Sequence, residues 1–273
     1  MREAPPPNKE TGPSLASEAA DPIALARRDL KKAFPRRFFK EAVAQQRDGK
    51  FVLLLDGRAA KTPGGNPLAM PTMAAALAVA AEWSAAREII DPAEMPLTRI
   101  VNSAIDGVAH RIEATAAEIA KYAGSDLMCY RAAEPEALAL AQAAAWDPVL
   151  AFARNKLSAP FICTQGMAFI EQPEAAIAAV TQAIARIMES GVAAPFALAA
   201  LHVMTTLMGS AVLALAVAYG EVTTAEAWRA AHVDEDFEIR TWGEDAEAMR
   251  RRASRWREMN AAAVLWQDVQ SGF

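Results

Sequence analysis

The chain has 273 residues, of which 53% are hydrophobic, and its formal net charge is −5. A chain of this length and composition can bury a large core, which excludes a disordered or fibrous protein. The small excess of acid leaves no broad positive field, so a nonspecific nucleic-acid binder is excluded as well.

The first 32 residues are predicted to form a disordered or loosely ordered tail. Residues 1–21 have no apolar stretch and include Glu3, Glu10, Glu18 and Asp21. Secretory and organelle-targeting peptides avoid such acidic residues. We therefore expect a protein without a targeting peptide that works in the cytoplasm.

A strand and its turns dominate the next segment. The run from Phe51 to Leu55 is apolar and β-prone, and an Asp-Gly pair stands at each end of it, at residues 48–49 and 56–57. Asp-Gly tolerates the positive φ angles that tight hairpins need. The pattern predicts a β-hairpin or meander whose second strand ends near Thr62.

Helical patterns fill nearly all of the remaining chain. The first predicted helix covers residues 72–88, and a proline-punctuated linker follows it. Further helices are expected at residues 99–122, 135–155, 173–190, 195–219, 223–241 and 245–269, with a β-like interruption at 161–170. The fold class is therefore α+β: a small mixed α/β N-terminal domain at 33–98, followed by an all-helical C-terminal bundle at 99–273.

One segment is long and apolar enough to suggest a membrane span. Between Glu189 and Glu221, 31 residues include no Asp, Glu, Lys or Arg. However, Pro195 and His202 interrupt its first half, its strongly apolar run is short, and its flanks are acidic. We expect a buried helix at the centre of the bundle, a chain that does not span a membrane, and a core position for His202.

The acidic segment from His232 to Glu247 holds the candidate site residues. At 100° per residue, Trp228, Ala231, Glu235, Ile239 and Trp242 share one stripe of a helix. A carboxylate on that apolar stripe needs a partner, because burying it unpaired is costly. Two interpretations stay open: an arginine such as Arg99 or Arg131 meets Glu235 inside the bundle, or Glu235 lines a partner-facing groove.

Trp242 is followed by Gly243, a combination that can end a helix and leave an indole exposed. Carboxylates beside an exposed aromatic ring suit an arginine-rich partner. We predict that Glu235, Glu238, Trp242 and Glu244 form the partner-binding surface. The alternative is that Trp242 belongs to the core and Gly243 only terminates the helix.

Signatures of catalysis and of cofactor binding are absent from the sequence. It contains no phosphate-binding loop, dinucleotide fingerprint, nucleophile elbow or zinc motif. Cys129 and Cys163 have no metal-ligand spacing and are expected to be reduced thiols. The sequence thus predicts a protein that is not an enzyme and that has no catalytic residues, metal site or cofactor.

Several colinear segments carry a resemblance to a known family. They are RRFFKEAVAQQRDGKFVLLLDGRAAKTPGGNPLAMPT at 36–72, MPLTRIVNSAIDGV at 95–108, SDLMCYRA at 125–132, WDPVLAF at 146–152 and VDEDFEIRTWGEDAEA at 233–248. Together they resemble the assembly chaperones that act on the alpha subunit of the F-type ATP synthase catalytic head. The chain departs from the family pattern at Glu238, where the family usually has Gln.

The resemblance implies an ATP-independent chaperone. Such a protein would bind the free alpha subunit, prevent its aggregation before it pairs with the beta subunit, and act as a monomer. Relatives are then expected in the mitochondrial matrix. The alternative is an enzyme or small-molecule-binding protein with a carboxylate site in the helical domain, for which the acids around Glu235 are the acid/base candidates.

Overall fold

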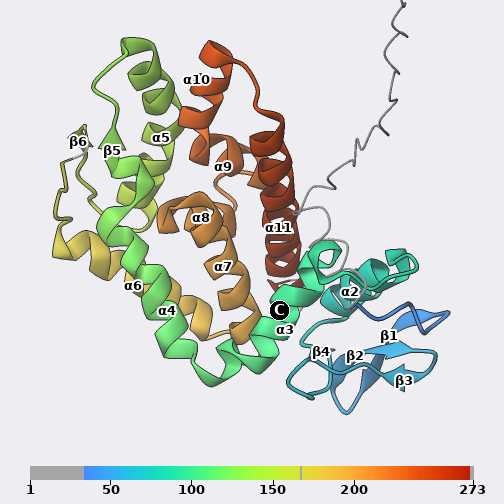
Figure 1. The fold of residues 1–273 in the computed structure, drawn as a ribbon. Helices are drawn as coiled ribbons and strands as arrows, with labels where there is room; N and C mark the ends of the chain where they lie inside the picture. The colour runs from blue at the N-terminus through green and yellow to red at the C-terminus, as the bar shows by residue number, and fades with distance from the viewer. Residues whose placement is uncertain (1–33, 167, 271–273) are drawn as a thin grey trace, which may run out of the picture.

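A computed structural model describes residues 34–166 and 168–270 of the chain. A small β-sheet with one covering helix forms the N-terminal part, and helices form the rest (Figure 1). The predicted α+β class, with a small sheet region followed by a helical bundle, is confirmed. The predicted tail at 1–32 lies outside the described residues.

The sheet is built around one central strand. Its strands are β1 (Ala42–Arg47), β2 (Lys50–Leu55), β3 (Arg58–Ala59) and β4 (Ala69–Met70). β2 pairs antiparallel with β1 on one side and with β3 and β4 on the other. The predicted strand is thus confirmed, and both Asp-Gly turns have positive φ at each residue. The second strand is shorter than predicted, because Lys61 forms only an isolated bridge with Pro67.

Helix α2 (Met73–Ala85) covers the sheet and connects it to the bundle. The Thr72 side chain caps its first turn by accepting from the backbone N–H of Ala75. Near its other end, the Glu82 carboxylate accepts hydrogen bonds from the backbone N–H groups of Leu97 and Thr98. Glu82 therefore caps the next helix, α3 (Pro96–Asp106), and fixes the angle between the two helices.

A second joint holds the loop after β3 against the end of α3. The Asp106 carboxylate accepts hydrogen bonds from Thr62 Oγ1 at 2.7 Å, from the Gly64 backbone N–H at 2.8 Å and from Asn66 Nδ2 at 2.8 Å. These donors lower the pKa of Asp106, with Asn66 making the largest contribution. The Thr-Pro-Gly-Gly turn is therefore a docking element of the sheet as well as a chain reversal.

We expect Gly64→Ala to destabilise this joint. A Cβ at residue 64 would lie 2.7 Å from the Asp106 carboxylate, so the carboxylate would have to leave some of its donors. The free energy of unfolding should fall by about 1–2 kcal/mol in a urea titration. Gly124→Ala is the control, because a Cβ there meets nothing within 4 Å. Equal effects of the two changes would contradict this role of Asp106.

The bundle contains nine α-helices within the described residues. After α3 come α4 (Ile112–Lys121), α5 (Glu136–Lys156), α6 (Glu174–Met188), α7 (Ala194–Met208), α8 (Ala211–Ala218), α9 (Thr224–Ala231), α10 (Val233–Trp242) and α11 (Ala246–Gln270). Short 3-10 turns lie at Pro92–Glu94, Val108–His110, Tyr122–Ser125, Leu127–Cys129 and Gly191–Ala193. The β-like interruption contributes β6 (Thr164–Gln165), which pairs in parallel with β5 (Tyr130–Arg131).

Three helices that the sequence predicts as continuous are each divided in two. The predicted helix at 99–122 breaks between α3 and α4, where Gly107 begins a 3-10 turn. The helix at 195–219 breaks at Gly209, whose φ of 65° is left-handed. The helix at 223–241 breaks at His232, which ends α9 and precedes α10. Periodicity did not reveal these breaks because apolar residues continue on both sides of each.

Helix α7 lies at the centre of the bundle (Figure 1). The segment Gly191–Met208 is long and apolar enough to cross a membrane, but 61% of it is buried inside the protein. Helices α3, α4, α6 and α11 pack around it. This arrangement confirms the predicted central helix. His202 departs from the expected core position, since its side chain is 34% exposed and its Nε2 lies 3.5 Å from Glu118 Oε2.

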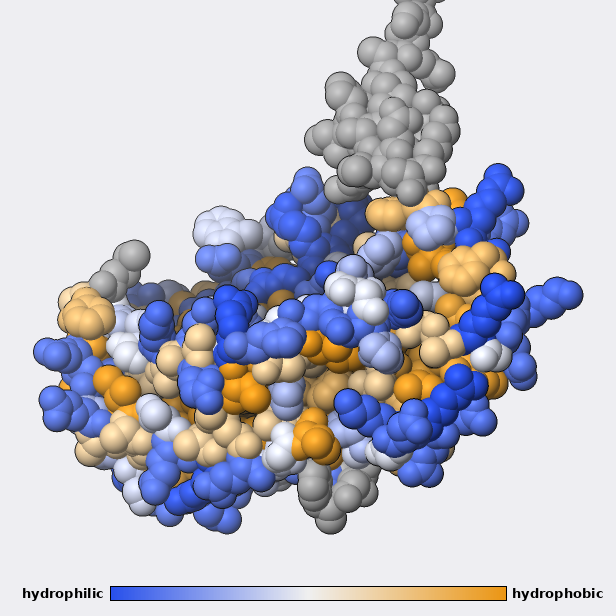
Figure 2. All heavy atoms as spheres, turned by 90° about the horizontal axis from the view of Figure 1, so that it is seen from below, coloured by the Kyte–Doolittle hydropathy of each residue, from blue (hydrophilic) through white to orange (hydrophobic). Residues whose placement is uncertain are grey.

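The sheet and the bundle share one continuous hydrophobic core. Helix α11 reaches back to α2, and Thr72 Oγ1 donates a hydrogen bond to the backbone carbonyl of Asp268. The division into domains at 33–98 and 99–273 stays a prediction. Figure 2 shows the molecule from below, where hydrophobic residues are scattered among hydrophilic ones in small patches. On that face, no broad apolar platform is visible among the residues that the structure describes.

Candidate partner-binding site

The acidic segment forms α10 and its turn into α11. Thr223 and Glu226 start the preceding helix, α9, with a capping box, in which each side chain accepts from the other residue's backbone N–H. At the far end, Gly243 terminates α10 with a φ of 89°. Asp245 Oδ1 then accepts from the backbone N–H of Ala248 in the first turn of α11. A tight corner therefore brings the end of α10 against the start of α11.

A groove of about 380 Å³ lies inside this corner. We call it the α10–α11 groove; its lining residues are Glu235, Glu238, Ile239, Trp242, Gly243, Asp245, Ala248, Met249, Arg251, Arg252 and Arg255. Three of the four predicted site residues, Glu235, Glu238 and Trp242, therefore line one surface. Glu244 is exposed beside the groove and is not part of its lining.

Trp242 is 85% exposed, the largest exposed fraction among the exposed large hydrophobic side chains of the described residues. The alternative of a core tryptophan is therefore wrong. The predicted single stripe of Trp228, Glu235 and Trp242 is also wrong, because the break at His232 turns α10 relative to α9. Trp228 is buried, whereas Trp242 projects into solvent. An exposed indole at the rim of a groove is a common anchor for a protein partner.

Glu235 does not meet an arginine inside the bundle. Arg99 pairs with Glu258, and Arg131 pairs with Asp147. The Glu235 side chain is 52% exposed, and its Oε2 lies 4.0 Å from His232 Nε2. Of the two interpretations that the sequence left open, the geometry favours a groove-facing Glu235.

Partly buried polar contacts fix α10 against the bundle. Gln142 Nε2 of α5 donates to Asp234 Oδ1 at 2.7 Å, and its Oε1 accepts from the backbone N–H of Ala132. Arg252 of α11 forms an ion pair with Asp236. Asp234 and Asp236 are thus used for anchoring, which leaves Glu235 and Glu238 to face the groove. Sequence reasoning missed Gln142, since a single Gln within an alanine-rich helix carries no signal.

His232 is buried at the junction of α9 and α10, next to the groove residue Glu235. Its Nδ1 lies 2.7 Å from the Trp228 carbonyl, and its ring packs on the Trp228 indole at a centroid distance of 3.9 Å. Burial lowers the pKa of His232, which favours the neutral ring at neutral pH. A neutral imidazole leaves the negative charge of Glu235 available to a partner.

The arginine-rich start of α11 forms the second wall of the groove. Arg251 pairs with Glu247, Arg252 with Asp236, and Arg257 with Glu94. Arg255 donates to the Leu207 carbonyl. Each of these four arginines is therefore engaged by a carboxylate or a backbone carbonyl. The groove therefore has an acidic wall from α10, a basic wall from α11 and apolar side chains such as Ile239 and Met249 between them.

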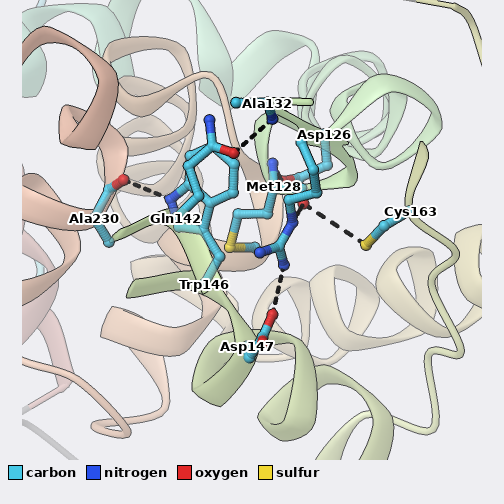
Figure 3. Close-up of polar contacts among 9 residues, drawn as sticks. Asp126, Met128, Ala132, Gln142, Trp146, Asp147, Cys163 and Ala230 are labelled. Atoms are coloured by element: carbon cyan, nitrogen blue, oxygen red, sulfur yellow. Dashed lines mark hydrogen bonds and ion pairs between the residues drawn. The ribbon is translucent and has the colours of Figure 1, made fainter. Parts of the chain in front are cut away.

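Two further segments of the predicted resemblance meet behind this site. Trp146, which is fully buried, donates from Nε1 to the Ala230 carbonyl of α9 at 2.7 Å (Figure 3). Arg131 donates to the Met128 carbonyl and pairs with Asp147, and its guanidinium lies 5.1 Å from the Trp146 ring centroid. The segments at 125–132 and 146–152 thus support α9, from which α10 projects.

Comparison with known proteins agrees with this architecture. Residues 36–154 match the family model of the ATP12 chaperone protein. Atp12 from Paracoccus denitrificans is 40% identical, with a TM-score of 0.78 over 86% of this chain and 98% of that one. The chain belongs to the ATP12 chaperone family. The predicted resemblance to the ATP synthase assembly chaperones is thereby confirmed.

Two other solved structures are similar along most of their length. The Atu1473 protein of Agrobacterium tumefaciens is 44% identical, with a TM-score of 0.81 over 92% of each chain. A mutant of P. denitrificans Atp12p is 40% identical, with a TM-score of 0.77 over 86% of this chain and 97% of that one. The similarity therefore extends beyond residues 36–154 to most of the chain.

Proposed function

We propose that this ATP12 chaperone binds the free alpha subunit of the F-type ATP synthase through the α10–α11 groove. Binding there prevents aggregation of the alpha subunit before it pairs with the beta subunit. The observation that carries the proposal is the exposed Trp242 indole beside the groove-lining carboxylates Glu235 and Glu238. Membership of the family supports the choice of client.

The chemistry of the groove suits a protein segment with basic and apolar side chains. A partner that covers Trp242 removes a large apolar surface from water, which is a strong source of binding energy. Glu235 and Glu238 then offer acceptors to arginine or lysine side chains of the partner. These contacts are noncovalent and form when the partner arrives. Recognition therefore needs no nucleotide and no covalent step.

The competing function is an enzyme with a carboxylate site. Catalytic carboxylates are usually enclosed in a deep pocket with convergent polar groups. Here Glu235 is 52% exposed and Glu238 is exposed on the same open wall. The open groove is therefore more typical of a protein-binding surface than of an active site. We propose that the protein is not an enzyme.

Charge reversal tests the site. We expect Glu235→Lys, Glu238→Lys and Trp242→Ala each to weaken capture of purified alpha subunit by roughly tenfold or more, since each removes a central contact. Glu244→Lys should have a smaller effect, because Glu244 lies beside the groove. Binding can be measured by interferometry with immobilised chaperone, together with light scattering of the alpha subunit on dilution from denaturant.

The matched control is Glu189→Lys, an exposed carboxylate at the end of α6 that makes no ion pair within the described residues. Its capture of the alpha subunit should equal that of the wild type. All variants should keep a thermal midpoint close to the wild-type value, because the substituted side chains are exposed. Unchanged capture in the groove variants, or unfolding of these variants, would remove the site from consideration.

A further inference from the structure

Each of the two cysteines directly precedes one strand of a parallel pair. Tyr130 of β5 is opposite Thr164 of β6, and Arg131 is opposite Gln165. Cys129 and Cys163 each come one residue before the strand, so continuing the register by one residue places them opposite one another. Adjacent strands are about 4.8 Å apart, and a disulfide accepts a Cα separation of roughly 4.4–6.8 Å. The backbone therefore brings two cysteines from different parts of the chain within bonding range.

The side chains agree with the backbone register. Cys163 Sγ lies 3.8 Å from the carbonyl oxygen of Met128, the residue before Cys129 (Figure 3). Cys163 is also among the neighbours that raise the pKa of the Cys129 thiol, as expected for two adjacent sulfurs. Both are free, with Cys129 buried and Cys163 exposed. We propose that Cys129 and Cys163 are a redox pair that closes into a disulfide when a hydroperoxide oxidises the exposed thiol.

The different environments of the two cysteines set the order of events. Burial raises the pKa of the Cys129 thiol, and the nearby Asp126 carboxylate raises it further. Cys129 therefore remains a thiol and is shielded from solvent, whereas Cys163 can meet a soluble oxidant. Cys163 reacts first, and Cys129 resolves the product.

The chemistry balances with one molecule of hydrogen peroxide. The Cys163 thiol first releases its proton. The thiolate then attacks one peroxide oxygen, the O–O bond breaks, and the leaving hydroxide takes up the released proton to form water. Cys163 is then a sulfenic acid. The Cys129 sulfur attacks the Cys163 sulfur, the S–O bond breaks, and the leaving hydroxide takes the Cys129 proton to form a second water. Two thiols are oxidised to one disulfide while the peroxide is reduced to water.

Closure would restrain the long connection between α5 and α6. The short β5–β6 pair holds this connection together with Gln172, whose side chain bonds both the N–H and the carbonyl of Ile162. Ala159 and Phe161 of the connection pack in the core. It displays two apolar side chains, Ile162 at 43% and Phe169 at 74% exposed. A covalent link at Cys163 would fix this apolar segment against the 3-10 turn that ends at Cys129.

The test treats the full-length reduced protein with a small molar excess of hydrogen peroxide and follows the intact mass. We expect a loss of two hydrogens, no remaining reactive thiols in denaturant, and a Cys129–Cys163 cross-linked peptide after digestion. Dithiothreitol should reverse all three changes. The thermal midpoint of the oxidised protein should rise by roughly 5 °C, since the link restricts the unfolded chain.

Cys163→Ser is the main control, because this exposed position tolerates a small polar side chain. It should retain a free, unreactive Cys129 under the same treatment. Cys129→Ala should stop at a Cys163 sulfenic acid that reacts with dimedone. A wild-type protein that instead accumulates sulfinic acid at Cys163, or forms only disulfides between molecules, with Cys129 still reduced, would overturn the proposal.

Discussion

Replacing Trp146 with alanine is expected to lower the free energy of unfolding by about 4 kcal/mol. The Trp146 side chain is fully buried, so its removal leaves a large cavity between α5 and α9. The change also leaves the Ala230 carbonyl without its donor and removes the aromatic face next to the Arg131 guanidinium. Guanidinium denaturation followed by circular dichroism measures the loss.

Two matched variants separate the contributions to this loss. Trp146→Phe keeps most of the apolar volume but loses the hydrogen bond, so a smaller cost of about 1–2 kcal/mol is expected. Trp242→Ala removes the same type of side chain from an exposed position and should change the stability by less than about 0.5 kcal/mol. Similar losses for Trp146→Ala and Trp242→Ala would show that the burial of Trp146 has been misjudged.

The second large effect is a dependence of the free energy of unfolding on pH, which we expect from the titration of Asp126. This fully buried carboxylate accepts from Ser210 Oγ and from the backbone N–H groups of Val212 and Met128. It thereby joins α8 to the 3-10 turn at Leu127–Cys129. Burial raises the pKa of Asp126 from 3.8 to about 6, although these donors oppose the shift. Protonation therefore favours the folded state. The stabilisation of the folded state by protonated Asp126 is fully present below the unfolded pKa of 3.8. It is lost as the pH rises through the folded pKa of about 6.

Asp126→Asn removes this titration and should flatten the corresponding part of the profile. Between pH 7 and pH 4, the wild type should gain about 2 kcal/mol of stability relative to the variant. Asp56, Asp106 and Glu226 have lowered pKa values and act in the opposite direction in more acidic solution, equally in both proteins. Urea titrations at several pH values measure the difference. A constant difference across this range would contradict the assignment to Asp126.

Local patterns in the sequence were sufficient to predict the type and the order of most elements. The strand from Phe51 to Leu55, its Asp-Gly turns and the capping box at Thr223 depend on residues that are close in the chain, so their chemistry can be read directly. The helix breaks at Gly209 and His232 were missed. A glycine is tolerated inside a helix as well as after it, and only packing against other helices selects the left-handed conformation at Gly209.

The candidate site was predictable in part for the same reason. The exposure of Trp242 follows from the adjacent Gly243, a local signal that the sequence contains. The environment of Glu235 depends on the angle between α9 and α10, which the contacts of Gln142 and Arg252 with α10 determine. Those partners lie far away along the chain, and periodicity carries no information about them.

The sequence by itself thus determined the fold class, the order of the elements and the family resemblance, because these depend on local propensity and on colinear motifs. Only the tertiary structure decided which charges pair, where helices break and which residues line the α10–α11 groove. The same holds for Cys129 and Cys163, which have no motif spacing and become neighbours only through the pairing of β5 with β6. Such contacts join residues that are distant in the chain, and the packing of the whole core selects them.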